Sequence, residues 1–178
     1  NLNISGGTIY VNAVGDGLDS NANITISGGY TVVDGPTNSM NGPLDGGTEN
    51  GGVISISGGT VFAGGASGMA EGFAASSEQC SFLITFPVSY EEGTLITVSS
   101  PDGTELFCHK TASGGSSLVF SCPELVMGES CILTIAEYEF ELPLTKMNNY
   151  LRVTSDGEVT EGSNGGFGGG GFPGGPRR

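Results

Sequence analysis

The chain has 178 residues, of which 33 are glycine and 37% are hydrophobic, so it can bury a modest core. It contains 19 acidic and only 5 basic side chains, which gives a formal net charge of −14. This charge excludes nucleic acid as a natural partner, because phosphate binding needs lysine and arginine. No apolar run approaches the roughly 20 residues of a membrane-spanning helix, so we expect no membrane insertion.

Three segments of the N-terminal half repeat one pattern, in which two short alternating strands flank an Ile-Ser-Gly-Gly corner. They cover residues 2–11, 24–33 and 54–63. Glycine at a corner permits the positive φ angles of a sharp bend. The corners recur at intervals of 22 and 30 residues. Short strands that repeat at such intervals predict an all-β fold that begins with a right-handed parallel β-helix of about three coils. The alternative is a two-sheet sandwich with coincidental turns.

Equivalent residues of successive coils should stack in columns about 4.8 Å apart. The expected inward columns are Ile4, Ile26 and Ile56; Ile9, Thr31 and Val61; Val11, Val33 and Ala63; and Leu18, Leu44 and Met69. An outward apolar column holds Tyr10, Val32 and Phe62, with Tyr30 nearby. Tyr10, Tyr30 and Phe62 are candidates for stacking on sugar rings, and the alternative is that this stripe packs beneath a neighbouring module.

The loops between the repeats carry oxygen-bearing side chains suited to calcium, which takes six to eight oxygen ligands. The candidate ligands are Asp16, Asp19 and Asn21 in the first loop and Asp45 in the second. Stacked coils would bring Asp45 over Asp19, and such a pair is destabilising without a cation. The first 109 residues hold 11 acidic side chains and no lysine or arginine, so a counter-charge is needed. The alternative is that these residues serve turn geometry alone.

The run Gly-Asp-Gly-Leu-Asp-Ser-Asn at residues 15–21, followed by Ile-Thr-Ile-Ser-Gly-Gly at 24–29, resembles a family of secreted bacterial carbohydrate-binding domain-containing proteins. The similarity extends over roughly residues 1–135. It implies a pectate-lyase-like β-helix that binds Ca²⁺ and plant polysaccharide, with ligands at the four positions named above. The second loop, residues 46–52, is longer than the family pattern, and the four cysteines are not a feature of the family.

From Cys80 onward the repeat is lost and strand hairpins follow, so we divide the chain into three parts. Residues 1–79 form the parallel coils, residues 80–155 a small antiparallel β module that covers the last coil, and residues 156–178 a glycine-rich tail or linker. Strands are expected at residues 80–86, 93–98, 104–110, 117–122 and 131–141.

The four cysteines, Cys80, Cys108, Cys122 and Cys131, form no CxxC pair, and His109 is the single histidine. A zinc site is therefore not expected. The even count predicts one or two disulfides in an exported protein.

The sequence predicts a non-catalytic, secreted or cell-surface protein that binds an acidic plant polysaccharide or cellulose through calcium. Calcium-assisted elimination needs a base beside the metal, and the repeats contain no lysine, arginine or histidine. Hydrolysis needs one carboxylic acid of raised pKa, whereas carboxylates that share calcium stay ionised. The alternative function is a structural subunit that self-associates end to end through the open edge of the first coil, near Asn1. A start without initiator methionine suggests a mature or excised piece.

Overall fold

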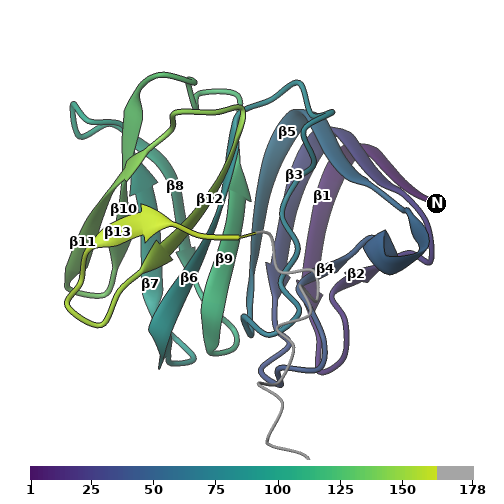
Figure 1. Ribbon diagram of the computed structural model, residues 1–178, viewed down its shortest axis with the longest axis horizontal. Coiled ribbons are helices and arrows are strands. Elements are labelled where there is room, and N and C mark those ends of the chain that lie inside the picture. Colours follow the sequence, from purple (N-terminus) through teal and green to yellow (C-terminus); the bar gives the residue numbers. More distant parts are fainter. Residues whose placement is uncertain (164–178) are drawn as a thin grey trace, which may run out of the picture.

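The computed structural model describes residues 1–163 and shows an all-β protein (Figure 1). The strands are β1 (Leu2–Asn12), β2 (Leu18–Asp19), β3 (Ile24–Asp34), β4 (Leu44–Asp45), β5 (Ile54–Gly65), β6 (Ser81–Tyr90), β7 (Leu95–Ser99), β8 (Glu105–Lys110), β9 (Gly115–Ser121), β10 (Ser130–Ile135), β11 (Tyr138–Pro143), β12 (Asn148–Val153) and β13 (Val159–Glu161). A single turn of 3-10 helix, η1, spans Thr48–Asn50. Most of the predicted tail, residues 164–178, lies outside the described residues. Within residues 1–163, no helix has the length and apolar character needed to cross a membrane.

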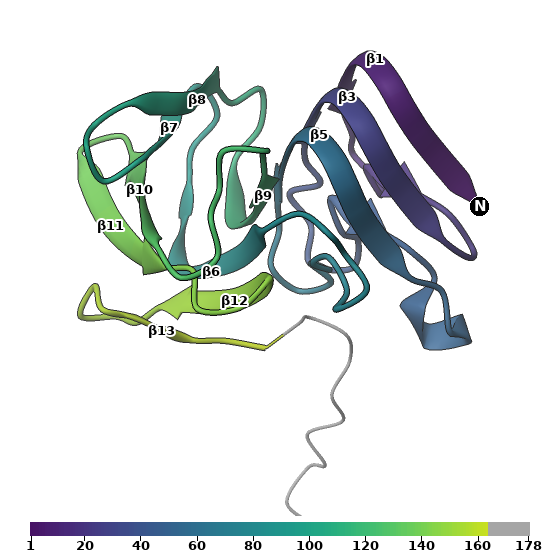
Figure 2. The same cartoon turned by 90° about the horizontal axis from the view of Figure 1, so that it is seen from above.

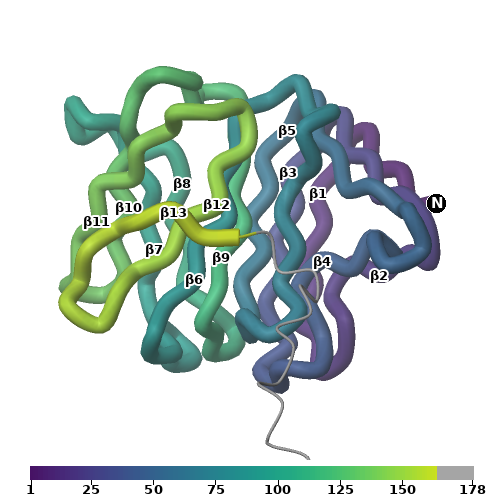
Figure 3. Tube along the Cα trace, viewed as in Figure 1, coloured from purple at the N-terminus to yellow at the C-terminus, as the bar shows by residue number. Residues whose placement is uncertain are grey.

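The strands form three sheets. A mixed seven-stranded sheet has the order β1-β3-β5-β9-β6-β12-β13, an antiparallel four-stranded sheet the order β11-β10-β7-β8, and β2 and β4 form a parallel pair. Figure 2 shows β1, β3 and β5 side by side at one end of the molecule and the strands of the second half gathered at the other. The tube view in Figure 3 follows the chain from the first group into the second.

The three repeats stack in parallel, in the predicted register. Ile4 pairs with Ile26 and Ile26 with Ile56, and the columns through Ile9 and Val11 also align as expected. Leu18 pairs with Leu44. Met69 is only half-buried, and its neighbour Ala70 occupies the core instead. The sheets do not close into a solenoid, so the structure establishes an all-β fold with stacked parallel repeats.

The corner glycines stack closely on one another. Gly29 has φ 95°, and a Cβ built there would lie 2.8 Å from the main-chain carbonyl carbon of Gly6 and from the carbonyl oxygen of Gly7. Gly7 itself has φ 84° but has open space around it. Both positions therefore need the backbone freedom of glycine, whereas only Gly29 also needs its small size.

We expect Gly29→Ala to lower the free energy of unfolding by about 2–4 kcal/mol, since left-handed strain and a backbone clash add together. Gly7→Ala, which carries the strain without the clash, should cost about 1–2 kcal/mol. Urea denaturation of both variants measures the difference. Equal costs would contradict the close stacking of the corners.

The second half continues the same sheet. β9 runs antiparallel to β5, with Phe120 opposite Phe62, so the last repeat is covered as predicted. β6 is antiparallel to β9 but parallel to β12, so the predicted antiparallel module contains one parallel pair. The strand predicted over residues 131–141 is two strands, β10 and β11, because Ala136 takes a positive φ of 53° between them.

Two cores lie on opposite faces of the seven-stranded sheet. One, between β2–β4 and the long strands, contains Leu18, Leu44 and the Ile4–Ile26–Ile56 column. The other, between the two large sheets, contains Phe62, Phe120 and Leu133. Successive side chains of a strand point to opposite faces, so each repeat contributes to both cores.

Candidate functional site

Asp19 and Asp45 lie side by side on the outer surface of the β2–β4 pair. They are in-register partners, and the Ser20 N–H donates to the Asp45 carbonyl at 2.9 Å. The preceding residues of these two strands, Leu18 and Leu44, are buried, so the two carboxylates point away from the core. The predicted stacking of Asp45 over Asp19 is therefore present.

The other two predicted calcium ligands are placed differently. Asp16 accepts a hydrogen bond from the Gly42 N–H at 2.8 Å, which ties the first loop to the second. This hydrogen bond fits the alternative interpretation, in which Asp16 serves turn geometry. Asn21 is exposed, and the main chain of Gly47 packs against its main chain. Asn21 thus lies in the same stacked turn as the carboxylate pair.

The carboxylate pair suits a divalent cation in donor type but does not by itself make a complete site. Within the described residues, no group of three or more His, Cys, Asp or Glu side chains is arranged to hold a metal ion. One oxygen of Asp45 already accepts the Gly47 N–H at 3.0 Å. Asp19 and Asp45 supply carboxylate oxygens, and calcium here would need further oxygens from Asn21, main-chain carbonyls, water or a ligand.

The predicted sugar-binding aromatics divide into a buried residue and a surface pair. Phe62 is fully buried and stacks on Phe107 with ring centroids 5.1 Å apart, so it is not accessible to a sugar. This corrects its assignment and matches the alternative that the stripe packs beneath a neighbouring module, because β8 crosses over it. Tyr10 is 69% exposed and makes an edge contact with Tyr30 at 6.3 Å. Burial, aided by the neighbouring Tyr10, raises the pKa of Tyr30.

The tyrosines and the acidic pair lie on opposite sides of a core. Asp19 and Asp45 are on the outer surface of β2–β4, whereas Tyr10 projects from the face of β1 that is turned away from that core. The core that contains Leu18 and Leu44 separates them. One sugar unit cannot contact both sets of residues.

The sequence reasoning missed a buried pair that joins the two large sheets. His109 Nε2 on β8 lies 2.8 Å from Asp34 Oδ2 at the end of β3, and the Asp34 side chain is 7% exposed. His109 also contacts the ring of Phe62 at 5.0 Å. The two residues are 75 positions apart in the sequence, so no local pattern indicated the pair.

Glu71 is a second buried carboxylate that the sequence did not single out. One of its oxygens accepts the Gly46 N–H at 3.0 Å and the other accepts the Thr48 hydroxyl. It thereby fastens the long second loop, residues 46–52, to the segment after β5. This gives Glu71 a structural role beside the acidic pair.

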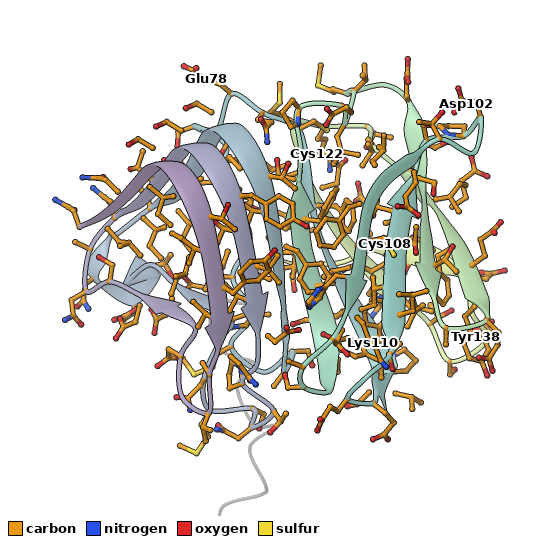
Figure 4. All side chains as sticks on the ribbon, turned by 180° about the vertical axis from the view of Figure 1, so that it is seen from behind. Glu78, Asp102, Cys108, Lys110, Cys122 and Tyr138 are labelled. Atoms are coloured by element: carbon orange, nitrogen blue, oxygen red, sulfur yellow. The ribbon has the colours of Figure 1, made fainter. Side chains whose placement is uncertain are left out.

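The four cysteines are free thiols, contrary to the predicted disulfides. Cys80, Cys122 and Cys131 are buried in the core between the large sheets, whereas Cys108 is exposed on β8. Burial raises the pKa of both Cys122 and Cys131 to about 12. Figure 4 labels Cys108, which lies on β8, and Cys122, which directly follows β9.

We expect a thiol reagent at mildly alkaline pH to modify one cysteine per native chain, Cys108, and all four after denaturation. A buried thiol of raised pKa has almost no reactive thiolate at that pH. Intact-mass measurement before and after alkylation counts the modified sites. Fewer than four modified sites in the denatured, unreduced chain would show that a disulfide exists.

Comparison of the chain with models of known protein families, with curated proteins and with solved structures found no match.

Proposed function

We propose that the protein is a non-catalytic, extracellular, calcium-dependent binder of acidic polysaccharide, and that its three repeats act as coils of a short parallel β-helix. The observation that supports this most is the in-register stacking of Asp19 and Asp45 on an outward surface. Two like charges one strand apart repel each other, and a shared cation removes that repulsion. The resemblance in sequence supports the same function.

Calcium gives an acidic protein a means of binding an acidic sugar polymer. The net charge of −14 opposes the approach of uronate carboxylates. A calcium ion held by Asp19, Asp45 and Asn21 would retain free coordination positions, because these side chains supply fewer than the six to eight oxygens that it takes. Uronate carboxylates or sugar hydroxyls are the donors that complete its shell.

Tyr10 and Tyr30 form a second contact surface for the polymer. The exposed Tyr10 on β1 and the half-buried Tyr30 on β3 form an edge-to-face pair that can stack on a sugar ring, as amphipathic aromatics do. Because a core separates them from the acidic pair, we assign them to a different stretch of a long polymer. They contribute affinity that does not depend on calcium.

A binding role fits the chemistry better than catalysis. His109 is engaged by Asp34 between the sheets, away from the outer surface that carries Asp19 and Asp45. Carboxylates that share a cation remain ionised and make poor general acids. The acidic pair therefore has neither the base needed for elimination nor the acid needed for hydrolysis.

Retention on polygalacturonate-coated resin tests this function. We expect retention in millimolar calcium, release by EDTA, and loss of calcium-dependent retention in D19N/D45N. The matched control is E137Q/E139Q, which removes the same charge from the exposed turn and start of β11 and should leave retention unchanged. Equal retention of D19N/D45N and the wild type would overturn the proposal.

A structural subunit that stacks end to end is the second candidate. β1 has eleven residues and is paired on one side only, with β3, in the described part of the chain. An open edge of this length is a template for pairing with another chain. Negative-stain microscopy separates the candidates, because filaments favour stacking and dispersed particles favour the binder.

A further inference from the structure

Three hollows adjoin one another along one rim of the second half, and we call them together the rim groove. The first, of about 590 Å³, is lined by Leu83, Thr85, Phe86, Arg152, Gly162 and Ser163, among others. The second, of about 530 Å³, is lined by Phe86, Val88, Tyr90, Tyr138, Phe140 and Gly157, among others. The third, of about 520 Å³, includes Glu139, Phe140, Glu141, Gly157 and Glu158. Phe86 lines both the first and second hollows, and Phe140 and Gly157 line both the second and third, so each hollow adjoins the next.

Exposed apolar side chains line the second hollow. Val88 is 77% exposed and Tyr138 is 62% exposed. Beneath them, Phe86 contacts the rings of Tyr90 and Phe140 at 6.4 Å and 6.2 Å. Figure 4 shows Tyr138 at the outer end of the four-stranded sheet, far from the repeats. Such a hollow offers apolar surface on which the apolar side chains of another segment can pack.

The third hollow is acidic. Glu139, Glu141 and Glu158 line it, and none of its lining residues is basic. One oxygen of Glu141 accepts the Ser130 hydroxyl at 2.9 Å, and no salt bridge to these three glutamates is present in residues 1–163. Along the groove, an apolar hollow is therefore followed by a negatively charged one.

The chain beyond Ser163 has the matching order of side chains. Ser163, the last described residue, lines the first hollow. Residues 164–178 contain Phe167 and Phe172, then Arg177 and Arg178, and no acidic residue. An extended chain spans up to about 3.5 Å per residue, so Phe167 can reach about 14 Å from Ser163 and Arg177 about 50 Å. In the chain, the two phenylalanines precede the two arginines, just as the apolar second hollow precedes the acidic third hollow.

We propose that residues 164–178 dock in the rim groove of their own chain. Phe167 and Phe172 occupy the apolar hollow around Phe86 and Phe140, and the two arginines lie beside the glutamates of the third hollow. Residues 1–163 carry three basic and nineteen acidic side chains, so a segment with two arginines is electrostatically attracted to them. This proposal is independent of the calcium site, which lies on β2–β4.

Hydrogen exchange of the full chain, without any added ligand, tests the docking. Replacing both aromatic anchors (F167S/F172S) should speed exchange of the groove amides in residues 88–91 and 136–140 by about fivefold, because strand ends that lose their cover open more readily. The matched control G165S/G170S changes the same segment and keeps both phenylalanines, so it should exchange like the wild type. Unchanged exchange in F167S/F172S would overturn the proposal.

A reciprocal change on the groove distinguishes docking from an indirect effect. V88S/Y138S alters two exposed side chains, so the fold is retained, and chymotrypsin should then cleave after Phe167 about fivefold faster than in the wild type. Cleavage at the same rate in both proteins would contradict docking. Protection that appears only as protein concentration rises would also overturn it, since a second copy would then be the occupant.

Discussion

Phe62→Ala should destabilise the protein by about 3–5 kcal/mol, the range for truncating a fully buried phenylalanine. The ring is 0% exposed, stacks on Phe107 and contacts His109. Its removal leaves a cavity where β5 of the repeats meets β8 of the other sheet. The free energy of unfolding from urea denaturation measures the cost.

Tyr10→Ala is the matched control, because Tyr10 belongs to the same predicted column but is 69% exposed. We expect it to change stability by less than about 0.5 kcal/mol. Similar costs for the two variants would contradict the packing of β8 over the repeats. A strong loss of polysaccharide retention in Tyr10→Ala with unchanged stability would separate its binding role from the packing role of Phe62.

His109→Ala should cost about 3 kcal/mol, because it leaves the buried Asp34 carboxylate without its partner. The pair joins β3 to β8 with 2.8 Å between Nε2 and Oδ2. The H109A/D34N double variant removes the charge as well, and it should recover part of the lost stability. Recovery in the double variant identifies the unpaired charge, rather than lost packing, as the main cause.

The exposed Lys146–Glu161 pair provides the control for this measurement. Its nitrogen–oxygen distance is also 2.8 Å, but its side chains are 63% and 77% exposed. Lys146→Ala should therefore cost less than about 1 kcal/mol. If His109→Ala lowers the free energy of unfolding no more than Lys146→Ala does, the Asp34–His109 pair does not stabilise the contact between the two sheets.

The stacking of the repeats was predictable because it follows from local sequence. Each Ile-Ser-Gly-Gly corner fixes where a strand bends, and the alternation on either side fixes which residues face inward, so the Ile4–Ile26–Ile56 column and the Asp19–Asp45 pair could be expected. The column through Leu18 and Leu44 has no leucine in the third repeat, and the prediction that Met69 completes it was wrong, because Ala70 is the buried residue. Repetition predicts register only where the copies remain alike.

The features that were not predicted, or that the sequence left open between alternatives, depend on contacts between distant segments. Phe62 is buried because β8, more than forty residues later, crosses its face of the sheet. The Asp34–His109 pair joins positions 75 residues apart. The cysteine count predicted disulfides, yet three of the thiols are buried as small apolar side chains in the core. Composition and periodicity specify neither which distant residue such a side chain contacts nor how deeply it is buried.

Calcium titration by calorimetry tests the central claim most directly, because it needs no assumption about the sugar. We predict a saturable binding signal for the wild type and E137Q/E139Q, and a loss of at least about tenfold in affinity in D19N/D45N, since carboxylate charge sets calcium affinity. Unaltered calcium binding in D19N/D45N, or no binding to the wild type, would contradict the account.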